Sequence, residues 1–330
     1  MKLGIIGSGI IVQEFLPKLV EMEGIEIAGI QGVKDMMDSV RALCEENRVP
    51  LATYDFDELC ASGIDTVYIA VPNFLHFDYC RKALEKGMNV IVEKPMTSNA
   101  KESQYLKELA ESKKLFLFEA VTTLYLGNYQ KIREWLPRIG DIKLVQSQYS
   151  QYSRRYDAFR EGEVLPAFDP LNSGGALMDL NLYNLHYVMG LFGRPKDVKY
   201  YANIERDIDT SGIVVMGYPS FQAFCVAAKD SKGTYGGIIQ GTNGCSRSSY
   251  PANLIGEVTL ELNDGTKESY DDGGAEARLI PEFTAFVNAI NNKDLEFCYQ
   301  QLDKSIAVSE IQTEARIGAG VHFPADDKEF

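Results

Sequence analysis

The chain has 330 residues, of which 45% are hydrophobic and 24% charged, so it is long enough for about two domains with normal buried cores. Its net charge of −14 argues against a nucleic-acid partner, because binding to phosphates needs clustered lysine and arginine. No apolar run reaches the length that spans a bilayer, so we expect no membrane partner either.

The cysteines and histidines indicate neither a disulfide framework nor a metal site. The six cysteines are Cys44, Cys60, Cys80, Cys225, Cys245 and Cys298, and no pair forms a C-x-x-C motif. The three histidines, His76, His186 and His322, lie far apart in the sequence. The chain enters a predicted strand at once, without a charged leader segment. We therefore expect a soluble, cytoplasmic protein with mostly free thiols and no metal.

The first 120 residues alternate predicted strands with predicted helices. The strands are Lys2–Ile6, Ile25–Ile30, Asp65–Val71, Asn89–Val92 and Leu115–Glu119, and the helices are Ile11–Glu21, Asp35–Asn47, Phe77–Lys86 and Asn99–Ser112. This alternation is typical of βαβ units around a parallel sheet, and right-handed crossovers would make the sheet doubly wound. The sequence thus predicts an α/β, Rossmann-type domain over residues 1–120.

From about Ile142 the pattern changes to strands joined by turns. The predicted strands are Ile142–Tyr152, Lys196–Ile204, Ser211–Gly217, Phe221–Lys229, Thr234–Gln240 and Glu257–Leu262, and the predicted helices are Gly174–Phe192, Pro281–Asn292 and Asp303–Ile317. Hairpins of this kind form antiparallel sheets. We expect a second, α+β domain over residues 121–330, with a large open, mainly antiparallel sheet covered on one face and a C-terminal helix at about 303–317.

A glycine loop follows the first predicted strand. Gly7-Ser8-Gly9-Ile10-Ile11-Val12 fits the first two positions of the pattern G-x-G-x-x-G/A, and Val12 replaces the third small residue. The first glycine permits a tight turn, and the second lets backbone N–H groups approach a pyrophosphate at the helix start. A simple turn is the alternative, but the position between a strand and a helix favours a dinucleotide site.

The second predicted strand ends without the acidic residue that binds the ribose of NAD. Its end reads Ile30-Gln31-Gly32-Val33-Lys34-Asp35, so the first carboxylate lies beyond the strand tip. Gln31 could bind a ribose hydroxyl and Lys34 a 2′-phosphate, although Lys34 could equally be a solvated loop residue. The pattern favours NADP over NAD.

A third predicted strand ends at the same sheet edge with Pro72-Asn73-Phe74-Leu75-His76. Asn73 can donate and accept hydrogen bonds there. His76 is as compatible with a simple helix start as with a cofactor contact.

Two further motifs indicate chemistry. Glu93-Lys94-Pro95 ends the apolar run Asn89–Val92, and ligands of open parallel sheets lie at such carboxyl ends. Gly174-Gly175 opens a helix on which Asp179 and Tyr183 are four residues apart and share a face. Asp179 could hold Lys94 and Tyr183 in place, with Lys94 stabilising alkoxide charge and Tyr183 acting as general base. The alternatives are a buried structural ion pair for Asp179 and a core tyrosine for Tyr183.

Taken together, these motifs resemble the glucose–fructose oxidoreductase and inositol dehydrogenase (Gfo/Idh/MocA) family. The resemblance covers most of the chain and rests on Gly7-Ser8-Gly9, Ala70-Val71-Pro72-Asn73, Glu93-Lys94-Pro95, Glu119-Ala120 and Gly174-Gly175…Asp179…Tyr183. It implies that Lys94 is the catalytic lysine, that Asp179 is the helix aspartate and that Tyr183 transfers the proton. It also implies sugar, inositol, polyol or dihydrodiol substrates and a homodimer or homotetramer built through the second-domain sheet.

Three departures from the family pattern stand out. Asn181 and Ser173 replace glycines that many members have, and residues 121–127 lack the arginine and His-Pro of dihydrodiol-type members. Arg154, Arg155 and Tyr156, in an expected loop after the first strand of the second domain, could reach the substrate.

The sequence therefore predicts an NAD(P)-dependent oxidoreductase that transfers hydride between nicotinamide and a secondary alcohol or ketone of a carbohydrate-like molecule. Predicted site residues are Lys94, Asp179 and Tyr183 for catalysis; Gly7, Ser8, Gly9, Ile10, Ile11, Gln31, Lys34, Pro72, Asn73, His76, Glu93 and Lys94 for the cofactor; and Lys94, Asp179, Tyr183 and Tyr156 for the substrate. One rival is a non-catalytic regulator that senses sugar or NAD(P) on the same fold. Another is a dehydrogenase of amino-acid metabolism or an imine reductase.

Overall fold

The computed structural model describes residues 1–274 and 277–329, which form two compact units. Unit 1 comprises Met1–Ala120 and Phe283–Asp303, and unit 2 comprises Val121–Glu282 and Lys304–Phe330. The boundary after Ala120 coincides with the change of pattern in the sequence. Residues 283–303, which the sequence pattern groups with the second domain, pack with unit 1 instead.

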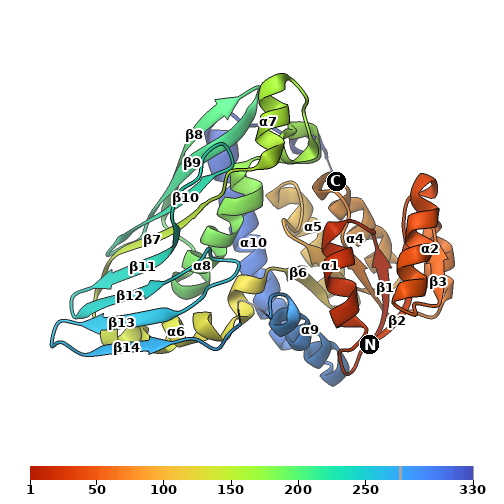
Figure 1. Cartoon of the computed structure of the whole chain (residues 1–330), viewed down its shortest axis with the longest axis horizontal. Coiled ribbons are helices and arrows are strands. Elements are labelled where there is room, and N and C mark those ends of the chain that lie inside the picture. Colours follow the sequence, from red (N-terminus) through yellow and green to blue (C-terminus); the bar gives the residue numbers. More distant parts are fainter. Residues whose placement is uncertain (275–276, 330) are drawn as a thin grey trace. The chain divides into compact units, whose positions relative to one another are not determined.

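Unit 1 is built around a parallel sheet (Figure 1). Its strands are β1 (Lys2–Ile6), β2 (Glu26–Gln31), β3 (Leu51–Thr53), β4 (Thr66–Ile69), β5 (Asn89–Glu93) and β6 (Leu117–Ala120). Within the described residues their order is β3-β2-β1-β4-β5-β6, and every neighbouring pair is parallel. This is the strand order of a doubly wound dinucleotide-binding sheet, so the predicted fold is confirmed.

The central strands form because their side chains are apolar on both faces. Val67, Ile69, Val90 and Ile91 have no exposed surface. Such continuous apolar runs suit a parallel sheet that helices cover on both sides. The helices of this unit are α1 (Ile10–Leu19), α2 (Met37–Glu46), α3 (Phe56–Ala61), α4 (His76–Glu85) and α5 (Ala100–Lys113), with α9 (Ile280–Asn292) and the start of α10 (Leu295–Gly318) joining from the C-terminal part.

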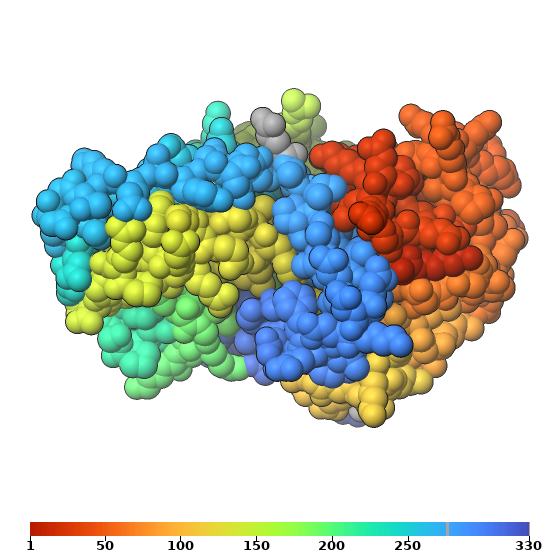
Figure 2. Space-filling model, turned by 90° about the horizontal axis from the view of Figure 1, so that it is seen from below, coloured from red at the N-terminus to blue at the C-terminus, as the bar shows by residue number. Residues whose placement is uncertain are grey.

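Aromatic rings attach α9 to the N-terminal sheet. The ring of Phe283 lies 5.0 Å from Phe15 and 5.1 Å from Tyr68, between ring centroids. The ring of Phe286 stacks on Phe118 at 4.5 Å. Figure 2 shows the blue C-terminal segment against the red N-terminal residues. These contacts explain why residues from the far end of the chain complete unit 1.

Unit 2 contains the large sheet. Its strands are β7 (Ile142–Ser150), β8 (Asp197–Glu205), β9 (Ile208–Gly217), β10 (Gln222–Ala228), β11 (Tyr235–Gly241), β12 (Gly244–Ser248), β13 (Val258–Leu262) and β14 (Lys267–Tyr270). In the described part of the unit their order is β14-β13-β12-β11-β7-β10-β9-β8. The pairs are antiparallel apart from β7 with β10, so the prediction of a mainly antiparallel sheet is confirmed.

Helices cover one face of this sheet, as Figure 1 shows for α8. The helices of unit 2 are α6 (Gly127–Ile139), α7 (Arg154–Glu161), α8 (Leu182–Phe192) and the end of α10, and a π-helical turn, Leu177–Asn181, leads into α8. Leu185 and Val188 of α8 pack in one buried cluster with Val145 and Tyr149 of β7. Alternation along the strands leaves every second side chain on the other face.

Some elements differ from the sequence-based expectation. Strands β3, β12 and β14 and helices α3 and α7 were not predicted, because they are short or mostly polar. Helix α6 was not predicted either, although its buried residues Tyr129, Ile132, Trp135 and Ile139 have helical spacing. Helix α10 begins at Leu295 rather than at about 303, with Asp294 accepting a hydrogen bond from the Phe297 N–H at 2.9 Å. Its early turns pack with unit 1 and its later turns with unit 2, so no single apolar stripe reveals its full length.

All six cysteines lie in the described part of the chain and are free thiols, as predicted. Among the described residues, no helix combines the length and the apolar character that a membrane crossing requires.

Candidate active site

The glycine loop of unit 1 lies at a cavity of about 360 Å³. The cavity is lined by Ile6, Gly7, Ser8, Gly9, Gln31, Gly32, Val33, Met36, Ala70, Val71, Pro72 and Tyr79. These residues follow β1, β2 and β4, so the cavity is at the carboxyl ends of parallel strands, where such sheets bind ligands.

The two glycines of this loop have different surroundings. Gly7 has a φ of +113°, and a Cβ there would lie 2.2 Å from the carbonyl oxygen of Ala70. A Cβ on Gly9 would meet nothing within 4 Å. Gly7 is therefore required by the protein's own backbone, whereas Gly9 leaves open space at the start of α1, where a pyrophosphate can approach N–H groups. The predicted residue Ile10 begins α1 and is 70% exposed, and Ile11 follows it.

Gln31 provides a buried acceptor in this cavity. Its side chain is 6% exposed, and Nε2 donates to the Tyr79 hydroxyl at 3.4 Å. The structure as described gives Oε1 no hydrogen-bond partner. A buried carbonyl oxygen normally has a donor, so a ligand hydroxyl would complete this site. The residues present thus fit a dinucleotide.

Lys34 lies in a 3₁₀ turn (Lys34–Met36) just after β2 and is exposed. Its Nζ is 5.6 Å from the centre of the Tyr54 ring. The strand tip itself carries Gln31, and Asp35 is exposed one residue beyond Lys34. Lys34 is a cation just after β2, and the tip of β2 carries no acidic residue. This combination suits a ribose that carries a 2′-phosphate.

The motif with Lys94 follows β5 at the same sheet edge. The Tyr68 hydroxyl donates to Glu93 Oε1 at 2.5 Å, and the backbone N–H of Met96 donates to Glu119 Oε1 at 2.9 Å. Lys94 itself is half-buried. The carboxylates of β5 and β6 thus fix the chain on either side of this lysine.

His76 connects this motif to the turn after β4. The ring has no exposed surface, and its nitrogens lie 2.8 Å from the Pro95 oxygen and 2.9 Å from the Val71 oxygen. Burial lowers the pKa of His76, and the nearby Lys94 charge lowers this pKa further, while the hydrogen bonds and Glu119 oppose the change. Burial thus favours the neutral ring, whose single N–H can donate to one of the two backbone oxygens at a time. Pro72 lines the cavity, and Asn73 begins a 3₁₀ turn, Asn73–Leu75.

In unit 2, the glycine pair is tightly packed. Gly175 has a φ of +103°, and a Cβ there would lie 2.1 Å from Asp209 Oδ1. A Cβ on Gly174 would lie 2.7 Å from the Pro166 oxygen. Ser173 adopts a left-handed conformation with a φ of 55°, which is typical of the glycine it replaces.

Asp209 holds the start of the helix that carries Asp179. Its Oδ2 accepts hydrogen bonds from the Leu177 N–H at 2.6 Å and from the Tyr200 hydroxyl at 2.7 Å. Burial raises the pKa of Asp209 to about 6. The sequence analysis did not identify this residue, because a single aspartate in a strand gives no local signal.

Asp179 lies in the π-helical turn and forms an ion pair within unit 2. Its Oδ2 lies 2.9 Å from Nζ of Lys229, which follows β10. Lys229 was also missed, although a lysine at the end of an apolar strand is the same signal that drew attention to Lys94.

Tyr183 occupies the first turn of α8 and is 9% exposed. Its ring lies 6.2 Å from that of Tyr149. Asn181, one of the departures from the family pattern, is buried and donates to the Cys225 oxygen at 3.3 Å, while its Oδ1 accepts from Asn184 at 2.9 Å. This asparagine therefore anchors the helix to β10.

Tyr156 lies on α7, not in the expected loop, because Ser153 caps a helix there by accepting from the Arg155 N–H. The Tyr156 hydroxyl donates to Glu205 at 2.7 Å, and this hydrogen bond raises the pKa of Tyr156 to about 12. Its contact with a substrate stays a prediction.

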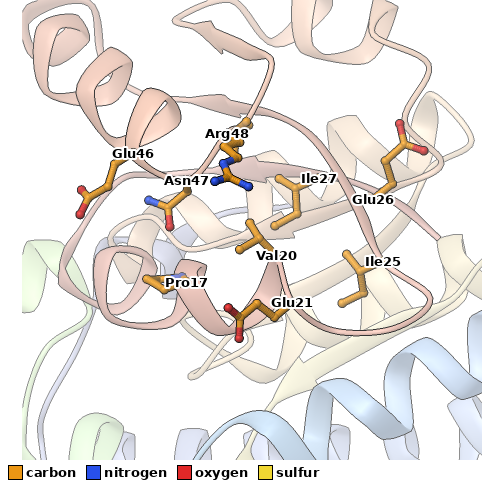
Figure 3. Close-up of a pocket in the computed structure, with 10 residues that line it drawn as sticks. Pro17, Val20, Glu21, Ile25, Glu26, Ile27, Glu46, Asn47 and Arg48 are labelled. Atoms are coloured by element: carbon orange, nitrogen blue, oxygen red, sulfur yellow. The ribbon is translucent and has the colours of Figure 1, made fainter.

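A second, more open cavity of about 520 Å³ lies elsewhere in unit 1 (Figure 3). It is lined by Pro17, Val20, Glu21, Ile25, Glu26, Ile27, Glu46, Asn47, Arg48 and Val49. It includes the start of β2, so it is at the amino ends of the strands. Ligands of such sheets bind at the other edge, which favours the glycine-loop cavity.

Comparison with known proteins agrees with this geometry. A family described as oxidoreductases with an NAD-binding Rossmann fold matches residues 1–121, and the GFO/IDH/MocA C-terminal domain matches residues 129–246. The chain belongs to the Gfo/Idh/MocA family. This membership confirms the predicted enzyme class, an NAD(P)-dependent dehydrogenase or reductase.

Two relatives are similar over nearly the whole chain. The scyllo-inositol 2-dehydrogenase (NADP(+)) IolU of Bacillus subtilis is 32% identical and covers 99% of both chains. The D-xylose 1-dehydrogenase (NADP(+)) 2 of Haloferax volcanii is 27% identical over 98% of this chain and 100% of its own.

A solved structure has the same fold. KijD10, a 3-ketoreductase from Actinomadura kijaniata in complex with NADP and TDP-benzene, superposes with a TM-score of 0.81 at 20% identity, over 98% of this chain and 99% of that one.

Proposed function

We propose that this Gfo/Idh/MocA enzyme uses NADP to oxidise a secondary alcohol of a cyclic polyol or sugar, or to reduce the corresponding ketone. The observation that carries the proposal is the position of Lys94, at the carboxyl end of β5 on the sheet edge that holds the glycine-loop cavity. The full-length similarity to an NADP-linked scyllo-inositol dehydrogenase supports the substrate class.

In this mechanism, Gly7, Ser8, Gly9, Gln31 and Pro72 would hold the dinucleotide, which would supply the hydride acceptor or donor when bound. Lys94 donates a hydrogen bond to the substrate oxygen and stabilises its developing negative charge. Tyr183 takes the hydroxyl proton during oxidation and returns it during reduction. Asp179 orients Tyr183 from one helical turn before it.

The first experiment is to follow nicotinamide absorbance with a panel of inositols, sugars and diols, with NADP and NAD in parallel. We expect NADP reduction by a cyclic polyol, and its loss in Lys94→Met. Turnover only with keto acids or imines would favour an amino-acid-pathway enzyme. Nucleotide binding without turnover on any of these substrates would favour the regulator.

The departures around the second glycine motif and after Glu119 motivated the regulator hypothesis. The first group consists of Ser173 and Asn181. Ser173 adopts the backbone conformation of a glycine, and Asn181 makes buried hydrogen bonds. Both substitutions therefore have a structural explanation that does not require loss of catalysis.

The preference for NADP rests on Lys34 and on Gln31 at the strand tip. We expect Lys34→Glu to weaken NADP binding by about 10- to 100-fold, because the 2′-phosphate would lose a cation and face a carboxylate. NAD binding should change little. Lys18→Glu is the matched control, since Lys18 lies at the far end of α1. Equal losses for both cofactors would contradict the assignment.

We also propose a cytoplasmic homo-oligomer. The free thiols fit a reducing compartment. On the sheet face opposite Val145, Leu144 is 44% and Ile213 is 43% exposed, and strand register places Phe224 and Val226 on the same face. The sedimentation coefficient of Ile213→Lys tests whether this face forms the oligomer contact. We expect the variant to be a monomer, and an oligomer of unchanged size would exclude this face as the contact.

A further inference from the structure

Lys229 is a buried cation that the proposed mechanism does not use. It is 2% exposed, and its Nζ donates to Asp179 Oδ2 at 2.9 Å and to the Ala167 oxygen at 2.8 Å. The same Nζ lies 4.8 Å from the centre of the Phe168 ring. A buried ammonium is stable only when such partners replace water, so these contacts determine where it lies.

The backbone of Lys229 is equally well fixed. Its N–H donates to the Thr210 oxygen at 2.8 Å, and its carbonyl oxygen accepts from the Ser153 N–H at 2.9 Å. The backbone of Lys229 is thus held between β9 and the N-cap of α7, and its ammonium lies against the loop before the π-helical turn. The Asp179 side chain, by contrast, is 34% exposed.

The Lys229 ammonium also acts on a second carboxylate. Asp209 on β9 feels the Lys229 charge and shares a hydrogen bond with Tyr200. Asp230 follows Lys229 directly and accepts from the hydroxyls of Thr210 and Ser211. The Lys229 ammonium therefore acts on the charge of both Asp179 and Asp209.

We propose that Lys229 is a positioning residue that fixes the carboxylate of Asp179 in place one helical turn before Tyr183. The inference rests on the proposed function, in which Asp179 orients the proton-transfer residue. Lys229 touches neither substrate nor cofactor in this proposal and acts through Asp179 alone.

The test compares Lys229→Met, which removes the charge and keeps the stem, with Lys232→Met as control. Lys232 is exposed in the turn three residues on. We expect Lys229→Met to lower kcat by about 10- to 100-fold, because a misplaced catalytic group costs up to that much, with little change in KM. The acid limb of the pH profile should move to higher pH, because Asp179 loses a cation that favours its charged form. Lys232→Met should match the wild type.

Double substitution separates an effect through Asp179 from a separate structural effect. If Lys229 acts only through Asp179, Asp179→Asn with Lys229→Met is no slower than Asp179→Asn alone. The proposal would be overturned if the loss of kcat in the double variant were the product of the losses in the two single variants. If Lys229→Met does not fold, as judged by thermal unfolding, Lys229→Gln replaces it, since it lacks the charge and keeps a donor.

A readout without turnover keeps this inference distinct from the proposed function. Carbon NMR of the Asp179 carboxyl should show titration at higher pH in Lys229→Met than in the wild type. An unchanged titration together with an unchanged kcat would overturn the proposal. If the wild type turns over none of the panel, the proposed function fails, and the titration alone decides whether Lys229 holds Asp179.

Discussion

Each unit carries a glycine motif before a helix and a lysine at the end of a strand, but the two units use them differently. In unit 1, Gly9 leaves open space beside a cavity, and Lys94 is half-buried at the same sheet edge. In unit 2, Gly175 is packed against Asp209, and Lys229 is buried against Asp179. Similar sequence motifs thus border open space beside a cavity in one unit and pack against buried side chains in the other.

The two lysines should differ most in catalysis. Lys94→Met should lower kcat by about 1,000-fold, because it removes the group that stabilises charge on the substrate oxygen. The loss for Lys229→Met should be smaller, since that lysine acts through another residue. Steady-state kinetics with the substrate found in the panel measures both. Equal losses for the two variants would remove the distinction between them.

The two glycines of the first loop should differ in whether their substitution affects NADP binding alone or also the stability of the fold. Gly9→Ala should weaken NADP binding by about tenfold or more, as its methyl group occupies the path of the phosphates, while stability stays within about 0.5 kcal/mol. Gly7→Ala should lower both binding and stability, because its Cβ would lie 2.2 Å from the Ala70 oxygen. Titration calorimetry and urea unfolding measure the two effects. A destabilised Gly9→Ala would contradict this assignment.

Substitution in the second glycine motif should lower the stability of the fold rather than weaken ligand binding. In Gly175→Ala, a φ of +103° is combined with a Cβ that would lie 2.1 Å from Asp209 Oδ1. The backbone strain alone should lower the free energy of unfolding by about 1–3 kcal/mol, and the contact with Asp209 should lower it further. Gly162→Ala is the control, because Gly162 has a φ of +104° and nothing within 4 Å of its Cβ position. The difference between the two in urea unfolding isolates the packing against Asp209. Equal losses would mean that backbone strain alone matters.

The Asp209 carboxyl should make the stability of the protein depend on pH. Burial raises the pKa of this carboxyl from 3.8 to about 6, so the folded state binds a proton that the unfolded state has released. The contribution of Asp209 to stability should therefore fall as the pH rises from about 4 to about 6. In urea unfolding, the stability of the wild type relative to Asp209→Asn should decrease over this range. A difference that rises or stays constant would show that the carboxyl is not held in its neutral form.

Much of the fold could be predicted because the signals were local. The buried runs of β4 and β5 and the turn at Gly7 depend on neighbours in the sequence, and so did the placement of Lys94 at a strand end. The glutamine at the tip of β2 also drew attention as a ribose contact, and the structure adds that its Oε1 is buried and, among the described residues, lacks a partner.

The contact between Asp179 and Lys229 could not be predicted in the same way. Within unit 2 the structure pairs Asp179 with Lys229, fifty residues later in the chain. The register of β10 beside β7 and β9 brings Lys229 there, and strand register across a sheet is not visible in either segment alone. Helix α7 was missed because its mostly polar residues lack an apolar stripe, and Tyr156 was therefore placed in a loop.

By itself the sequence determined the class of fold, the glycine loop, the strand-end lysine and the family to which the chain belongs. These features follow from short-range periodicity and from residues whose chemistry is specific at fixed spacing. Only the tertiary structure decided which glycines face open space, how α9 completes unit 1 and which cation holds Asp179. Those outcomes depend on packing between distant segments, where burial forces each polar group to find a partner.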